Sequence, residues 1–213
     1  MLFSLTKGFL LGAFTLVIGY IGDNTISKKT TVLIKEKDLS LYNQAMRALF
    51  LNLLVVFPIT YNIVDSTLIN HNVSFFLIQL DKIGIILLVQ NVVYYIAHRT
   101  LHKVTFLYKF HSFHHKFDKI LIPSLGQAVS VVEYCTAYLV PFILGAWITN
   151  PSEISFIICI SILGLLGMVI HCQELYNVKY LFFLVSPHDH IEHHKLRNKH
   201  FAAPLIDIDK FLE

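Results

Sequence analysis

Five long apolar stretches limit what this chain can fold into. A helix needs roughly 20 mostly apolar residues to cross a bilayer, and stretches of about that length recur along the whole sequence. Because hydrocarbon offers no water to unpaired backbone groups, such stretches cross the membrane as helices. We therefore expect an all-α, polytopic membrane protein with about four to five transmembrane helices. The candidate spans are about Leu2–Ile21, Ala45–Val64, Phe75–Ala97, Ser124–Ile148 and Ile154–His171.

The composition agrees with a membrane protein. Charged residues make up only 15% of the chain and hydrophobic residues 55%, whereas soluble domains average about 25% charged residues. The net charge of +3 is small and dispersed, so we expect no nucleic-acid partner. The three cysteines lie in or next to apolar runs without a CxxC pair, which argues against a disulfide framework or a zinc knuckle.

Basic residues indicate the orientation of the spans. The connections 65–74 and 149–153 carry no Lys or Arg, whereas the other segments between and after the spans are basic. By the positive-inside rule the basic segments are cytosolic, and five spans then place the N-terminus outside. We expect the first span to be a retained anchor, because no clear signal-peptide cleavage site follows it. The basic residues are Lys28, Lys29, Lys35, Lys37, Arg47, Arg99, Lys103, Lys109, Lys116, Lys119, Lys179, Lys195, Arg197, Lys199 and Lys210.

Eleven of the twelve histidines lie between His98 and His200. They form an HxxxH and two HxxHH clusters, all on the predicted cytosolic side. Residues i, i+3 and i+4 share one helix face, so each cluster points two or three imidazoles in one direction. Crowded imidazoles repel one another when protonated, and a bound cation removes that conflict. The clusters are His98 and His102; His111, His114 and His115; His190, His193 and His194; with His171, His188 and His200 between or after them.

This number of imidazoles exceeds the need of one ion and indicates a dimetal site. Structural zinc sites usually include thiolates, which this pattern does not supply. All-nitrogen sites with open positions suit redox iron. The pattern therefore favours oxygen activation in an apolar, lipid-filled environment.

The ordered motifs resemble those of the fatty acid hydroxylase/sterol desaturase superfamily over roughly residues 89–212. The segments His98-Arg-Thr-Leu-His102, His111-Ser-Phe-His114-His115 and His190-Ile-Glu-His193-His194 are similar to its three histidine boxes. Glu133 resembles the glutamate of its first hairpin helix, which implies a catalytic role. His171 resembles an extra ligand before the last box. The resemblance implies nine metal ligands: His98, His102, His111, His114, His115, His171, His190, His193 and His194.

The chain length suits a single membrane domain over residues 1–213, with N-terminal spans in 1–74 and a catalytic core in 75–213. The same resemblance implies a non-haem di-iron oxygenase that uses O2 to hydroxylate or desaturate a C–H bond of a lipid or sterol. Electrons would come from a separate carrier such as cytochrome b5 with its NAD(P)H reductase. The membrane would be the endoplasmic reticulum of a eukaryote or the inner membrane of a bacterium, with the metal site on the cytosolic side.

Several positions depart from the family pattern. Asn91 stands where the family often has Asp, Ser130 where it often has His, and Leu175 where some members have a second His. Either one metal would then lack a ligand, or His188 or His200 would supply it. Five carboxylates are candidates for orienting the imidazoles: Asp118, Glu133, Glu174, Asp189 and Glu192. Five aromatic residues are candidates either for packing or for a substrate path: Tyr94, Tyr95, Tyr134, Tyr138 and Trp147.

Two other functions stay open at this point. One is a catalytically inactive family member that acts as a membrane scaffold. The other is a histidine-rich metal-binding or transport protein, which would need charged residues near mid-membrane. The charged residues inside the candidate spans are Lys7, Arg47, Asp81, Lys82 and Glu133. The substrate class and the choice between hydroxylation and desaturation are not encoded in any motif.

Overall fold

A computed structural model describes residues 2–118 and 120–212, so Lys119 of the basic segments lies outside the described residues. Five helical stretches in this part of the chain are long and apolar enough to cross a membrane, which confirms the all-α, polytopic fold. They are α1 (Leu2–Thr25); α3 (Leu39–Leu51), η1 (Asn52–Val56) and α4 (Phe57–Thr67) in continuous succession; α5 (Leu80–Lys103); α7 (Val131–Glu133), η4 (Tyr134–Leu139) and α8 (Val140–Thr149); and α9 (Glu153–Ile170).

Two spans begin later than the sequence predicts. The third begins at Leu80 rather than near Phe75. The residue before it, Gln79, contacts the start of α9: its backbone N–H donates to Ser155 Oγ at 2.9 Å, and its Oε1 accepts from the Ser152 N–H at 2.7 Å. The fourth begins at Val131 rather than near Ser124, because Pro123–Gln127 forms a separate 3-10 helix, η3. Ser130 then caps α7 by accepting a hydrogen bond from the backbone N–H of Glu133.

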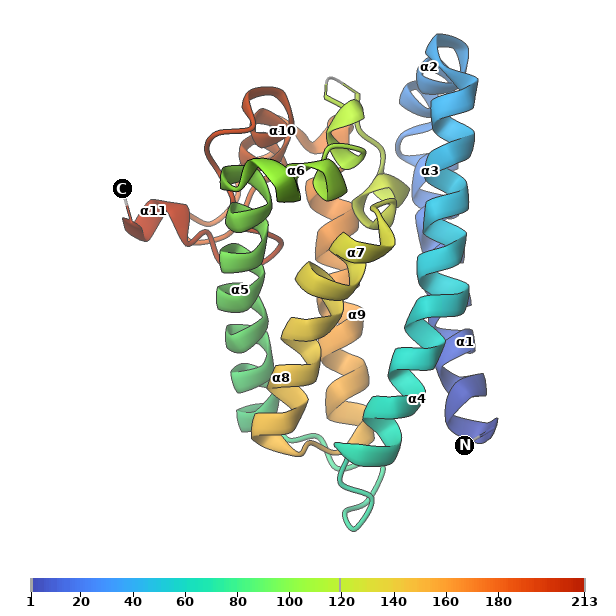
Figure 1. Ribbon diagram of the computed structural model, residues 1–213, viewed down its shortest axis with the longest axis vertical. Coiled ribbons are helices and arrows are strands. Elements are labelled where there is room, and N and C mark those ends of the chain that lie inside the picture. Colours follow the sequence, from blue (N-terminus) through green and yellow to red (C-terminus); the bar gives the residue numbers. More distant parts are fainter. Residues whose placement is uncertain (1, 119, 213) are drawn as a thin grey trace.

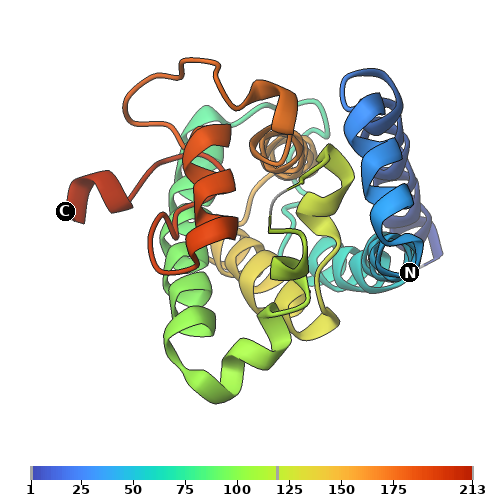
Figure 2. The same ribbon diagram turned by 90° about the horizontal axis from the view of Figure 1, so that it is seen from above.

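The spans pack in two groups (Figures 1 and 2). Helix α1 lies along α4, α5 lies along α8, and α9 contacts both α5 and η3. Gly12 lets α1 approach very closely, since a Cβ atom there would lie 1.9 Å from the carbonyl oxygen of Leu53. Small residues of this kind commonly allow backbone contact between membrane helices.

Two of the spans contain a π-helical segment. Segment η1 ends two residues before Pro58, and η4 ends two residues before Pro141. Proline lacks an N–H and its ring displaces the carbonyl of the preceding turn, which explains a local change of helical pitch. Such segments are frequent at functional sites, and both of these face the same internal cavity.

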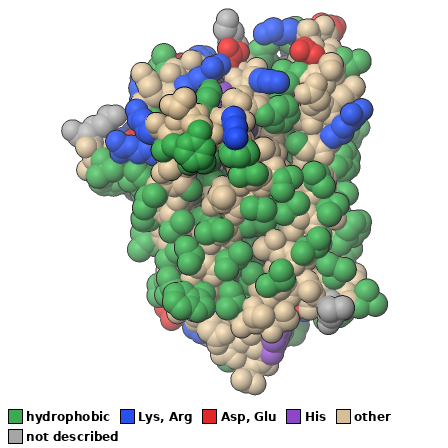
Figure 3. Space-filling view, viewed as in Figure 1, with side chains coloured by type: hydrophobic (Ala, Val, Ile, Leu, Met, Phe, Trp, Pro, Cys, Tyr) green, Lys and Arg blue, Asp and Glu red, His purple; other side chains and the backbone are tan. Residues whose placement is uncertain are grey.

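Short helices cover one end of the bundle and form a histidine-rich cap. The cap comprises α6 (Thr105–His111), η2 (His114–Lys116), η5 (Gln173–Leu175) and α10 (Pro187–Leu196), while α2 (Lys28–Lys37) extends α1 at the same end. Helix α11 (Asp209–Leu212) projects to one side of the bundle, beside α5. Most Lys and Arg side chains visible in Figure 3 lie at this end, above a belt of exposed apolar side chains. The surface therefore has the amphipathic profile of a protein seated in a bilayer.

Candidate metal centre

Four parts of the fold bring histidines to one place in the cap. His98 and His102 lie one turn apart at the end of α5, which continues through a short break into α6. His171 follows α9 directly. Helix α10 is fixed by Ser186, which caps its N-terminus by accepting a hydrogen bond from the N–H of Asp189. The i, i+3, i+4 spacing then points the last histidine box inward.

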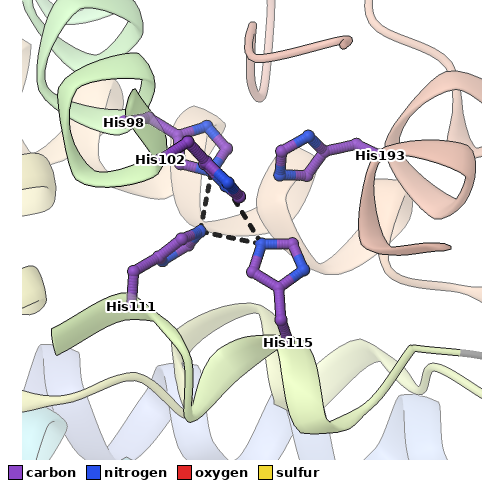
Figure 4. A group of neighbouring side chains, drawn as sticks. All are labelled: His98, His102, His111, His115 and His193. Atoms are coloured by element: carbon purple, nitrogen blue, oxygen red, sulfur yellow. Dashed lines mark hydrogen bonds between the residues drawn. The ribbon is translucent and has the colours of Figure 1, made fainter. Parts of the chain in front are cut away.

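The nine predicted ligands form two groups with the geometry of metal sites. In each group, one ligand atom from every histidine lies within 4.8 Å of the others. The first group is shown in Figure 4 and contains His98, His102, His111, His115 and His193. The second contains His114, His171, His190 and His194.

Each HxxHH box contributes to both groups. His115 belongs to the first group and its neighbour His114 to the second, and His193 and His194 divide in the same way. Across the two groups, the rings of His115 and His194 have centroids 4.7 Å apart, and those of His111 and His114 lie 5.6 Å apart. The two groups are therefore adjacent and share their supporting backbone.

Backbone carbonyls fix the tautomers of five of these histidines. A carbonyl oxygen only accepts hydrogen bonds, so a ring nitrogen that bonds to it carries the proton. In all five rings this nitrogen is Nδ1, which leaves the lone pair on Nε2. The pairs are His98 with Phe201 (2.7 Å), His171 with Gly167 (2.7 Å), His193 with Lys199 (2.8 Å), His194 with Phe117 (3.1 Å) and His115 with His194 (3.4 Å).

The Nε2 atoms point at one another at short range. Nε2 of His111 lies 3.0 Å from that of His98 and 2.9 Å from that of His115, as the dashed lines of Figure 4 show. Within the described residues, Nε2 of His193 and Nε2 of His194 are buried without a hydrogen-bond partner. Facing lone pairs repel unless a cation lies among them, so the donor set fits metal ions.

Burial keeps the imidazoles outside the spans neutral. It lowers the pKa of His171 to about 4 and that of His115 to about 3. Burial, followed by repulsion from neighbouring imidazoles, lowers the pKa of five others well below the usual range. These are His111, His114, His190, His193 and His194. The neutral form is the one that binds metal.

Among the five candidate carboxylates, Glu133 reaches the centre. Its Oε1 lies 2.7 Å from Nδ1 of His111, and both side chains are fully buried. The other four make contacts elsewhere: Asp118 with Arg197, Glu174 with Ser27 and Thr30, Asp189 with Ser186 and Lys210, and Glu192 with Tyr176 and Lys195.

The two candidate extra ligands lie outside both groups. His188 is half exposed, with Nδ1 3.2 Å from a carboxylate oxygen of Asp189. His200 has a left-handed backbone with φ of 56° and belongs to neither group. Asn91 has a structural role that the sequence did not reveal: its Oδ1 accepts a hydrogen bond from the N–H of Ile206. It thereby anchors the segment that carries Phe201, the hydrogen-bond partner of His98.

An apolar cavity opens beside the second group, inside the bundle. The centre of a water-sized sphere can occupy about 70 Å³ of it, and His171 forms part of its wall. Three of the five candidate aromatic residues line it: Tyr94, Tyr134 and Tyr138. Trp147 instead is exposed on the lipid-facing surface of α8, and the hydroxyl of Tyr95 accepts a hydrogen bond from Arg99.

Fold and site together define a helical membrane protein with a buried, two-part histidine centre above an apolar cavity. The sequence profile described as "Fatty acid hydroxylase" matches residues 83–213. The chain therefore belongs to the fatty acid hydroxylase family, as its histidine boxes predict.

Curated relatives carry the same domain name. The chain is 28% identical over 122 residues to "Fatty acid hydroxylase domain-containing protein 2" from Homo sapiens and from Macaca fascicularis. The alignment covers 57% of this chain and 35% of each relative. No solved structure matches this chain.

Proposed function

We propose that this protein is a membrane-bound non-haem di-iron oxygenase that hydroxylates or desaturates a C–H bond of a lipid or sterol. One observation carries the proposal: His171 belongs to the second histidine group and also lines the apolar cavity. A metal ion in that group would therefore face a space that suits a hydrocarbon. A metal transporter needs a polar path across the bilayer instead, and this cavity is mostly apolar.

The chain's residues would hold and tune two irons. The first group supplies five imidazoles and the second supplies four. Iron bound there would supply the activation of O2 and its transfer to the substrate. The backbone carbonyls fix the ring orientations, Glu133 orients His111, and the apolar wall excludes water.

The reaction requires partners that the membrane and the cell supply. The substrate would enter from the bilayer, and electrons would come from a separate carrier such as cytochrome b5 with its NAD(P)H reductase. The concentration of Lys and Arg around the cap favours a cytosolic metal site. This location corresponds to the endoplasmic reticulum of a eukaryote or the inner membrane of a bacterium.

Iron content and product analysis test the proposal. The purified protein should contain two irons per chain and consume O2 with a lipid extract and a reductase. Mass spectrometry should detect lipids that gain one oxygen atom or lose two hydrogen atoms. Two irons without either product would indicate a scaffold, and iron or zinc transport into vesicles would indicate a transporter. Either result would overturn the proposal.

A further inference from the structure

Gln90 places a polar group in the apolar cavity. The residue lies on α5 and is 3% exposed. Its Oε1 is buried and has no hydrogen-bond partner among the described residues. Gln90 precedes His98 by eight residues, which is about 12 Å along a helix. The unpaired oxygen thus lies well inside the bundle, at a fixed distance from the metal centre.

The surrounding wall does not supply the missing hydrogen. Most side chains that line the cavity are apolar, among them Leu53, Phe57, Phe142 and Leu163. The tyrosines on the same wall make no hydrogen bond to Gln90 Oε1. A buried amide oxygen without a donor is costly, and native proteins rarely keep one unless something else binds to it. The position therefore indicates a ligand that carries a hydrogen-bond donor on an otherwise apolar body.

A second amide on the same wall supports this interpretation. Gln127 also lines the cavity, and its backbone is held in place because Asn52 Nδ2 donates to the carbonyl oxygens of Gln127 and Val129, at 3.1 Å and 3.0 Å. A hydroxyl group both donates and accepts hydrogen bonds. It can therefore donate to Gln90 while it accepts from a neighbouring amide.

We propose that Gln90 is a specificity-determining residue that binds the hydroxyl group of a lipid in this cavity. The hydrogen bond would set how far the lipid extends toward His171 and hence which carbon faces the metal centre. Selection of the reacting carbon rests on the proposed oxygenase function. Binding of the hydroxyl group is independent of that function, so the binding can be tested in protein that has been stripped of metal.

Matched lipid pairs test the binding step. Two pairs of lipids are compared, and in each pair only the first member carries a hydroxyl group: cholesterol with cholestene, and octadecanol with octadecane. Metal-free protein is incubated with each lipid, and mass spectrometry quantifies the lipid that the protein retains. In at least one pair, we expect the wild type to bind the hydroxyl-bearing lipid about tenfold more tightly, the ratio that one buried hydrogen bond supports. Gln90→Leu, and Gln90→Met as a second variant of similar length, should abolish the preference. The control Gln44→Leu, an exposed glutamine on α3 outside the cavity, should keep it.

Three results would overturn the inference. The first is equal binding of the two lipids within both pairs, and the second is a preference for the hydroxyl-bearing lipid that persists in both Gln90 variants. The third is that none of the four lipids is retained, which would leave water as the hydrogen-bond partner of Gln90 Oε1. Absence of oxygenase activity would contradict the proposed function alone, because the binding measurement uses no iron, O2 or reductant.

Discussion

Oε1 of Glu133 lies 2.7 Å from Nδ1 of His111, and this contact joins the fourth membrane span to the histidine cap. The first turn of α7 carries Glu133 with its backbone N–H held by Ser130, so the carboxylate has little freedom. The contact favours a proton on Nδ1 of His111 and leaves Nε2 free for the first group, next to His98 and His115. Glu133 thus acts on the centre through His111.

Glu133→Gln should weaken metal binding at the first group. Glutamine keeps the size of the side chain but removes the negative charge that supports His111. Loss of such supporting groups typically costs about 10–100-fold in metal affinity. Titration with a competing chelator measures this loss. Glu192→Gln is the control, because that carboxylate binds Tyr176 and Lys195 at the surface. Equal affinities in both variants would contradict the role of Glu133.

His193→Ala should remove about one metal ion per chain, whereas His188→Ala should remove none. Both residues lie on α10, but His193 belongs to the first group and its Nε2 is buried without a hydrogen-bond partner in the described structure. His188 is half exposed and pairs with Asp189. Metal analysis of the two purified proteins separates the outcomes. A full metal complement in His193→Ala would refute the composition of the first group.

Metal-free protein should lose stability as the pH falls from about 6.5 to about 4. Burial lowers the pKa of His171 to about 4 in the folded state, whereas a free imidazole has a pKa of about 6.5. Between these values the unfolded chain binds the proton and the folded chain does not, so acid favours unfolding. Each such histidine contributes a slope of up to about 1.4 kcal/mol per pH unit.

Unfolding measurements in detergent at several pH values check this dependence. In His171→Gln, the free energy of unfolding should change less steeply with pH than in the wild type, by the equivalent of about one bound proton. His188→Ala should show the same pH dependence as the wild type. A stability that stays constant over this range would mean that the histidines have the same pKa in the folded, metal-free protein as in the unfolded chain.

The spans and the histidine boxes were predictable because both signals are local. Apolar length identifies a span without knowledge of its neighbours, and the HxxHH spacing follows from helix geometry. The division of His114 and His115 between two groups was not predictable. It depends on η2, a short 3-10 helix, and on how α5 and α10 pack over it.

The hydrogen-bond partners of the histidines could not be predicted from the sequence, for a different reason. The carbonyl oxygens of Lys199 and Phe201 fix His193 and His98, and any residue type supplies a carbonyl. Their positions depend on a loop after α10 that Asn91 anchors from another span. Gln90 was missed because a single polar residue hardly alters the hydropathy of a span, and only the packed bundle shows that it faces a cavity.

Gly12→Ala should destabilise the packing of α1 on η1, and Gly84→Ala should not. A Cβ at position 12 would lie 1.9 Å from the backbone oxygen of Leu53, which belongs to a helix and cannot rotate away. The two helices would have to separate, at a cost of about 1–3 kcal/mol or more. A Cβ at position 84 meets no described atom within 4 Å, and alanine is the better helix former. Thermal unfolding of both variants in detergent compares them directly. If Gly12→Ala unfolds at the wild-type temperature, α1 does not pack as closely on η1 as its backbone contact with Leu53 requires.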